Sequence, residues 1–138
     1  MCGRFALSAT TKDVEKLLPI LKSTEELKPR YNIAPTQPIA AILNISPNEI
    51  TFLRWGMIPF WAKNKSIGNK MINARAETLL EKPSFRNLLR KRRCLIIADG
   101  FFEWKKIKGE KKKIPYFIKI LFYTFSFFNN HVLLGIRD

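Results

Sequence analysis

The stretch CLIIADGFFEW, residues 94–104, decides the fold of this chain. Its first five residues are apolar and bounded by a turn signal, which predicts a buried strand over Cys94–Ala98. Asp99-Gly100 then predicts a turn or bulge. The aromatic run Phe101–Trp104 predicts a second strand, so the stretch indicates two strands joined by a sharp change of direction.

Glu103 is the one carboxylate inside the second predicted strand, and it has apolar neighbours on both sides. If its side chain faces inward, partial loss of water raises its pKa, as general acid–base chemistry requires. Because side chains alternate along a strand, an outward and solvated glutamate is equally consistent with the pattern.

The flanking sequence predicts further short strands and helices. Thr10 and Asp13 form a capping-box pattern before a helix that should end near Leu18, ahead of Pro19. A second helix is expected over Ser84–Arg90, and another is expected to begin within Asn73–Glu77. Strands are expected at Phe5–Ser8, Ile39–Leu43, Ile50–Leu53 after a Pro47-Asn48 turn, Ile114–Phe128 as one or two core strands, and Val132–Ile136. Lys28–Gln37 is expected to be an ordered loop, and Lys105–Lys113 an exposed hairpin loop.

The chain has 138 residues, 46% of them hydrophobic, which is enough for one folded domain over residues 1–138. It shows neither internal repeats nor an interdomain linker. The net charge is +14, with 25 basic and 11 acidic residues, which favours a polyanionic partner such as nucleic acid. Part of that excess comes from the lysines of residues 105–113, but arginines are spread over the rest of the chain.

Two cysteines and one histidine indicate neither a disulfide framework nor a metal site. Cys94 is expected to be a buried core thiol. The first residues lack the pattern of a signal peptide, and Ile114–Phe128 is too short for a clean membrane span. We therefore expect an intracellular protein in the cytoplasm or nucleoid, or in the nucleus of a eukaryote, that is monomeric and needs no cofactor.

Cys2 directly follows Met1, so removal of Met1 leaves an N-terminal cysteine. Such a residue carries an amine and a thiol on adjacent carbons, and the two groups together can condense with one aldehyde. Its α-amine titrates near 7.7–8.0, so part of it is neutral and nucleophilic at physiological pH. Position alone favours the other interpretation, an ordinary residue of a flexible tail.

Two further segments have both a structural and a functional interpretation. The aromatic stretch RWGMIPFW, residues 54–61, is typical of a core lid but also of a groove that stacks bases. The basic run Arg90–Arg93 suits the C-terminal end of a helix, and it suits phosphate binding equally well.

Five blocks, in order, resemble the SRAP (SOS response-associated peptidase) family. They are MCGRF (1–5), RYNIAPTQ (30–37), RWGMIPFWA (54–62), INARAET (72–78) and FRNLLRKRRCLIIADGFFEWKK (85–106). The resemblance implies an α+β fold with a barrel-like β core flanked by short helices. It also implies a DNA damage response protein that senses abasic sites in single-stranded DNA and forms a thiazolidine crosslink through its N-terminal cysteine.

The resemblance assigns roles to residues of this chain. Cys2 is the implied nucleophile, Asn73 positions the cysteine and the sugar, and Glu103 shuttles protons. The implied DNA-binding residues are Arg4, Pro35, Trp55, Trp61, Arg75 and Arg86. No metal is implied.

The resemblance ends near Lys119, and residues 119–138 diverge from the family. The family carries a histidine in an HDRMP segment, whereas His131 lies in NNHVLLGIRD, which does not match. We therefore expect a shortened or divergent copy and give His131 no catalytic role. Besides the abasic-site crosslinker, two hypotheses stay open. One is a cysteine-type peptidase that removes its own first residue, and the other is an inactive relic that only binds single-stranded DNA. Lyase-like activity is a further expectation for an active protein.

Overall fold

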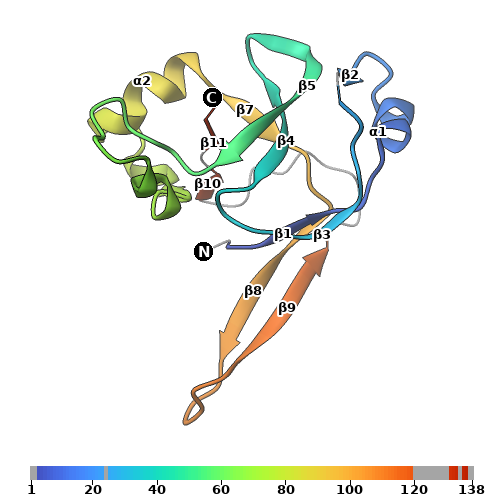
Figure 1. The fold of residues 1–138 in the computed structure, drawn as a ribbon. Coiled ribbons are helices and arrows are strands. Elements are labelled where there is room, and N and C mark those ends of the chain that lie inside the picture. Colours follow the sequence, from blue (N-terminus) through green and yellow to red (C-terminus); the bar gives the residue numbers. More distant parts are fainter. Residues whose placement is uncertain (1–2, 24, 120–130, 134, 137–138) are drawn as a thin grey trace.

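The computed structural model describes residues 3–23, 25–119, 131–133 and 135–136, the last two ranges by their backbone. These residues form two larger β-sheets, a two-stranded ladder and two α-helices (Figure 1). The expected mixed α+β class is confirmed. Within the described part of the chain, the sheets do not close into a barrel.

The first sheet has the strand order β3-β1-β8-β9, and all three ladders are antiparallel. Its strands are β3 (Arg30–Ile33), β1 (Phe5–Leu7), β8 (Gly100–Lys106) and β9 (Lys113–Lys119). Figure 1 shows the β8–β9 hairpin extending away from the rest of the molecule, with β1 and β3 at its base. The strands predicted at Phe5 and Phe101 are thus confirmed, together with the exposed turn between β8 and β9.

The second sheet has the strand order β11-β5-β4-β7, and β2 pairs with β5 as well. Its strands are β11 (Gly135–Ile136), β5 (Ser46–Trp55), β4 (Pro38–Leu43), β7 (Cys94–Ile96) and β2 (Lys22–Ser23). The β4–β5 hairpin was expected, but its turn lies at Asn44-Ile45 instead of Pro47-Asn48. The Asn44 side chain accepts from the Arg93 N–H at 2.8 Å and donates to the Lys91 carbonyl, which fixes the turn at this position.

The main core lies around Trp55, whose side chain is fully buried. Its ring is tilted against the ring of Phe5, with 5.3 Å between the centroids. Its indole N–H donates to the Ile72 carbonyl at 2.9 Å, which satisfies the polar atom of this buried side chain. Trp55 therefore ties the last residue of β5 both to β1 and to the segment that precedes Asn73.

Helix α1 (Thr11–Leu17) begins with the predicted capping box between Thr10 and Asp13 and ends at Leu18, before Pro19. The Thr10 side chain lowers the pKa of the Asp13 carboxyl through a hydrogen bond. Helix α2 (Pro83–Lys91) also matches its prediction and buries Phe85. Phe85 belongs to a second core cluster with Met57, Ala74 and Leu79.

Two segments differ from the sequence prediction. Arg30–Ile33, expected to be part of a loop, is strand β3, because its backbone pairs with β1. Residues 73–75, where a helix was expected to begin, form strand β6 (Asn73–Arg75), which pairs with β10 (His131–Leu133). The 3-10 helix η1 (Lys65–Asn69) precedes β6, and the 3-10 helix η2 (Ala76–Thr78) follows it.

The apolar run predicted as one or two core strands from Ile114 begins with an exposed strand instead. β9 lies at the edge of its sheet among the described residues, and all its side chains are exposed. The rest of that predicted segment, residues 120–128, lies outside the described residues. The strand predicted over Val132–Ile136 is represented by β10 and β11.

Candidate functional site

The first described residues continue the β1–β8 ladder toward the projecting hairpin. The Phe102 N–H donates to the Arg4 carbonyl at 2.9 Å, one step beyond the Phe5–Phe101 pair. Continued by one residue, this register brings Gly3 opposite Glu103. The Arg4 guanidinium donates to Asn32 Oδ1 on β3 at 3.0 Å. Cys2 itself lies outside the described residues.

Glu103 lies on the inward face of the first sheet. Side chains alternate along β8, so Glu103 shares a face with Phe101, which packs against the main core. Phe5, the register partner of Phe101, is fully buried on the same face. Glu103 is half-buried. Of the two orientations open from the sequence, the structure thus shows the inward one.

Strand β6 presents Asn73 and Arg75 on one face and Ala74 on the other. Ala74 packs into the second core cluster, which fixes the orientation of the strand. Asn73 is half-buried, with its Oδ1 atom shielded from solvent, whereas Arg75 is exposed. In the β6–β10 register, His131 is opposite Arg75 and Leu133 is opposite Asn73.

Trp55 connects these two parts of the candidate site. It packs on Phe5, next to Arg4, and holds the Ile72 carbonyl, next to Asn73. Its ring is fully buried, so it is not available to stack on a base, and the expectation that Trp55 lines a DNA groove is wrong. Trp55 is instead a core residue that positions the strands of the site.

Trp61 is exposed and available to a ligand, with 56% of its surface accessible. It lies beside Phe60, which is 97% exposed and to which the sequence assigned no role. The Ala62 N–H donates to the Pro59 carbonyl at 2.9 Å, so Phe60 and Trp61 are the central residues of a β-turn. This turn pushes both rings outward. The signal in the sequence was an aromatic pair directly after a proline.

Pro35 lies in a loop that is fastened to the backbone of Trp55. The Thr36 N–H donates to the Trp55 carbonyl at 2.9 Å, and the Trp55 N–H donates to the Gln37 carbonyl at 3.0 Å. The Gln37 side chain accepts from Arg30 Nη2 at 2.7 Å, which closes the loop. Pro35 is half-buried and thus contributes a fixed surface beside the core.

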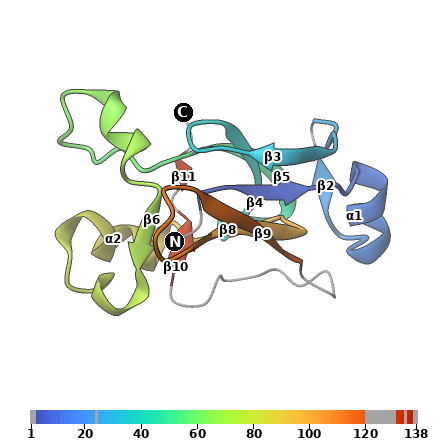
Figure 2. The same ribbon diagram turned by 90° about the horizontal axis from the view of Figure 1, so that it is seen from below.

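Arg86 lies on α2, which packs near β6 through the cluster of Phe85 and Ala74, and Figure 2 shows α2 beside that strand. It is exposed, next to the buried Phe85. The basic end of this helix has a structural function as well, because Asn44 bonds the backbone of both Lys91 and Arg93. The structure therefore leaves phosphate binding by Arg86 as an expectation.

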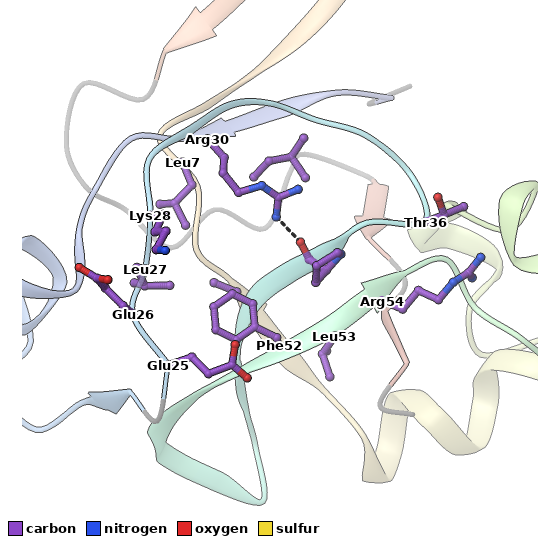
Figure 3. A pocket seen from close by; sticks show the side chains of 13 residues that line it. Leu7, Glu25, Glu26, Leu27, Lys28, Arg30, Thr36, Phe52, Leu53 and Arg54 are labelled. Atoms are coloured by element: carbon purple, nitrogen blue, oxygen red, sulfur yellow. Dashed lines mark hydrogen bonds between the residues drawn. The ribbon is translucent and has the colours of Figure 1, made fainter.

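A pocket of about 610 Å³ lies on another part of the molecule, between the segment around Leu27 and the β4–β5 hairpin (Figure 3). Its walls carry charges of both signs, including Glu25, Lys28 and Arg54. The Arg30 side chain reaches across its wall to the Pro38 carbonyl. Neither Asn73 nor Glu103 lines this pocket, so it is distinct from the candidate site.

Over the described residues, no cluster of three or more His, Cys, Asp or Glu side chains is arranged to hold a metal ion. In the same part of the chain, we find no helix of the length and hydropathy that crossing a membrane requires.

The family model of the SOS response associated peptidase (SRAP) matches residues 1–131. The chain belongs to this family. Abasic site processing protein YoaM of Bacillus subtilis is 50% identical over 123 residues, which cover 87% of this chain and 54% of that protein. Abasic site processing protein HMCES of Rattus norvegicus is 34% identical over 142 residues, which cover 86% of this chain and 40% of that protein. This SRAP chain thus spans about half the length of the curated relatives it matches, or less.

Solved structures agree with the family assignment. A crystal structure of a protein from Bacteroides thetaiotaomicron superposes with a TM-score of 0.74 at 30% identity, over 87% of this chain and 55% of that one. A crystal structure of a phage-related protein from Bordetella bronchiseptica gives a TM-score of 0.64 at 27% identity, over 97% of this chain and 59% of that one. The sheets and helices described above therefore form a fold that is found in these solved structures.

Proposed function

We propose that this SRAP chain processes abasic sites in single-stranded DNA by forming a covalent crosslink through Cys2. Membership of the SRAP family carries the proposal, together with the names of the relatives, which are abasic site processing proteins. The geometry supports it, because Glu103 lies on the inward face at the position that pairs with Gly3, the residue bonded to Cys2.

The proposed reaction is a condensation that releases one water. An abasic site in its ring-opened form carries an aldehyde at C1′. The Cys2 amine adds to this carbon, and loss of the hydroxyl as water gives an imine. The Cys2 sulfur then adds to the same carbon while the imine nitrogen takes up a proton, which closes a five-membered thiazolidine. Met1 must be removed first, because a peptide bond at the Cys2 nitrogen blocks the first step.

The described residues have complementary tasks in this reaction. Glu103 takes the proton that the attacking amine loses and gives one to the departing hydroxyl, which is general acid–base catalysis. Asn73 hydrogen-bonds the sugar from a half-buried position on β6. Arg75, exposed on the same face of β6, pairs with a phosphate, and Phe60 and Trp61 offer a stacking surface for the neighbouring bases.

A denaturing gel tests the proposal. Purified protein without Met1, checked by intact mass, is incubated with a labelled single-stranded oligonucleotide that contains one abasic site. We expect a band of lower mobility that survives heat and denaturant, and we expect it to be lost in Cys2→Ala. The abundant lysines can form imines with the same aldehyde, and such adducts persist on the gel only after borohydride reduction. A band in Cys2→Ala without reduction, or no band in either protein, contradicts the proposal.

A peptidase function is the second candidate, and the name of the family favours it. In the simplest version, the protein removes its own Met1. Expression of wild type, Cys2→Ala and Glu103→Gln, followed by intact mass, separates this from removal by host aminopeptidases. Ala, like Cys, is small enough for host removal, so retention of Met1 in both variants supports self-processing, whereas its loss in all three proteins contradicts it.

A further inference from the structure

The pocket between the segment around Leu27 and the β4–β5 hairpin has an apolar floor. Five nearly fully buried aliphatic side chains contribute to it: Leu7, Leu27, Ile33, Ala40 and Leu53. Phe52, which is half-buried, adds an aromatic ring. The volume of about 610 Å³ is that of a small-molecule site. The floor therefore suits a small ligand that carries apolar side chains.

The two ends of this pocket differ in charge. Figure 3 shows Glu25 and Glu26 at one end of the pocket, and Thr36 with Arg54 at the other. Lys28 also lies at the first end, where two carboxylates outweigh its single positive charge. The pocket thus offers carboxylates to one end of a ligand, and a hydroxyl and a guanidinium to the other.

The two arginines of the pocket differ in how far their donors are used. The Arg30 guanidinium donates to the Pro38 carbonyl and to Gln37 Oε1, so it holds the rim of the pocket in place. Arg54 donates from Nη2 to Asn69 Oδ1 at 3.1 Å, while its Nη1 is shielded from solvent without a hydrogen-bond partner among the described residues. Arg54 therefore keeps a positive charge that no carboxylate of the described residues neutralises.

Thr36 has a backbone conformation that is unfavourable for threonine. Its φ is +75°, and among the described residues it is the only non-glycine residue with a positive φ. It is the third residue of a β-turn that the hydrogen bond from the Gln37 N–H to the Ala34 carbonyl closes, a position that favours glycine. The Thr36 N–H donates to the carbonyl of Trp55, the residue after Arg54, which keeps Thr36 and Arg54 close together. Strain of this kind collects at ligand sites, and here it places a hydroxyl at the pocket.

We propose that this pocket binds a short apolar peptide with free termini. The ammonium group of the peptide bonds to Glu25 and Glu26, its carboxylate accepts from the Thr36 hydroxyl and the Arg54 guanidinium, and its side chains cover the apolar floor. Nucleic acid is a poorer occupant, because the two glutamates repel its phosphates. The inference goes beyond the proposed function, since it requires neither Cys2 nor DNA.

The test is a titration of isotope-labelled protein with trileucine, followed through the backbone amide shifts by NMR. We expect saturable shifts at residues that line the pocket, with Thr36 and Phe52 among them. N-acetyl-trileucine lacks the ammonium group and trileucine amide lacks the carboxylate. Each is expected to bind roughly tenfold more weakly, since each loses a hydrogen bond between charged groups. Triglycine, which has no apolar side chains, is expected to give no saturable shifts.

Two sets of variants test the two ends of the pocket. Thr36→Gly removes the hydroxyl and the strain, so it should bind trileucine several-fold more weakly and yet melt at a higher temperature than wild type. Thr36→Ser keeps the hydroxyl and should retain the affinity. Glu25→Gln/Glu26→Gln should bind roughly tenfold more weakly. The control Glu15→Gln/Glu49→Gln removes the same charge from α1 and β5 outside the pocket and should bind as wild type.

Several results overturn the proposal. One is the absence of saturable shifts with trileucine, and another is equal affinity for trileucine and its two blocked forms. Equal losses in the test and control glutamate variants overturn it as well. Saturable shifts at the same residues with adenosine monophosphate, and none with trileucine, assign the pocket to a nucleotide and overturn it too.

Discussion

Glu103 lies where β8 leaves the core and enters the projecting hairpin. Its neighbour on the inward face, Phe101, still packs against the main core, whereas Trp104 on the other face is already exposed. A carboxylate at this boundary has access both to solvent and to the site around Gly3. This position suits a residue that exchanges protons with a substrate during the reaction.

We expect Glu103→Gln to slow crosslinking without abolishing it. Removal of a general acid–base group typically costs about 10²–10⁴ in rate, while the Cys2 nucleophile stays in place. The measurement is the initial rate of crosslink formation on abasic single-stranded DNA under single-turnover conditions. Glu110→Gln, in the exposed turn of the same hairpin, is the matched control and should react at the wild-type rate. A wild-type rate for Glu103→Gln shows that Glu103 moves no proton in the rate-limiting step.

Cys94 is the second cysteine of the chain, and burial makes it a poor nucleophile. It packs against the main core, and loss of water raises the pKa of its thiol. A raised pKa keeps the thiol protonated at a pH where an exposed cysteine already forms thiolate. In Cys2→Ala, where Cys94 is the remaining cysteine, alkylation by iodoacetamide should be slow in the folded protein. The alkylation rate of the folded protein should also reach its plateau at a higher pH than the alkylation rate of the protein unfolded in urea. A plateau at the same pH in both conditions contradicts this prediction.

At the level of the elements, the turn after β5 depends on Gly56. This residue has φ +125°, and a Cβ built there lies 2.2 Å from the Gly68 carbonyl oxygen. The close approach lets the Met57 N–H reach the Met71 carbonyl at 2.9 Å, just before Ile72 and Asn73. A side chain at position 56 thus separates β5 from the segment that carries the site.

Gly56→Ala should therefore destabilise the fold by about 3 kcal/mol or more, since backbone strain and overpacking add. Gly109→Ala is the control: its φ is +88°, but the space around it is open. Strain alone should cost about 1–2 kcal/mol there. Urea unfolding followed by circular dichroism gives both values. If the two substitutions lower the free energy of unfolding by the same amount, the close contact with Gly68 is contradicted.

Most of the elements could be predicted from local sequence, because local chemistry decides them. The capping box of Thr10 and Asp13, the proline before α2 and the apolar run of β4 each indicate their element directly. The turn of the β4–β5 hairpin was misplaced because Asn44 is held by Lys91 and Arg93, which are far away in the sequence. The β6 strand was missed for a similar reason, since it exists through its pairing with β10.

The candidate site was only partly predictable, and the two tryptophans of residues 54–61 show why. Trp55 and Trp61 have the same local composition, yet one is fully buried and the other is exposed. The difference arises from the contact of Trp55 with Phe5, some fifty positions away in the sequence, and from the turn that carries Phe60. The inward orientation of Glu103 likewise follows from the register of β1 with β8, which local sequence does not contain.

At the scale of the whole molecule, the two larger sheets contribute different parts of the structure. One sheet holds the core around Trp55, and the other brings Glu103 and the start of the chain together at the base of a basic hairpin. The net charge of +14 favours association with a polyanion. In the proposed function, charge favours the encounter with DNA, and the chemistry of residue 2 distinguishes covalent processing of abasic sites from simple binding.

The most direct measurement of that chemistry is the position and mass of the adduct. Protein crosslinked to an abasic oligonucleotide is digested with nuclease and trypsin, and the modified peptide is identified by tandem mass spectrometry. We predict an adduct on the peptide Cys2-Gly3-Arg4, which lacks Met1, with a mass equal to that of the peptide plus the sugar fragment less one water. Adducts confined to lysine-containing peptides, or none on Cys2, contradict it.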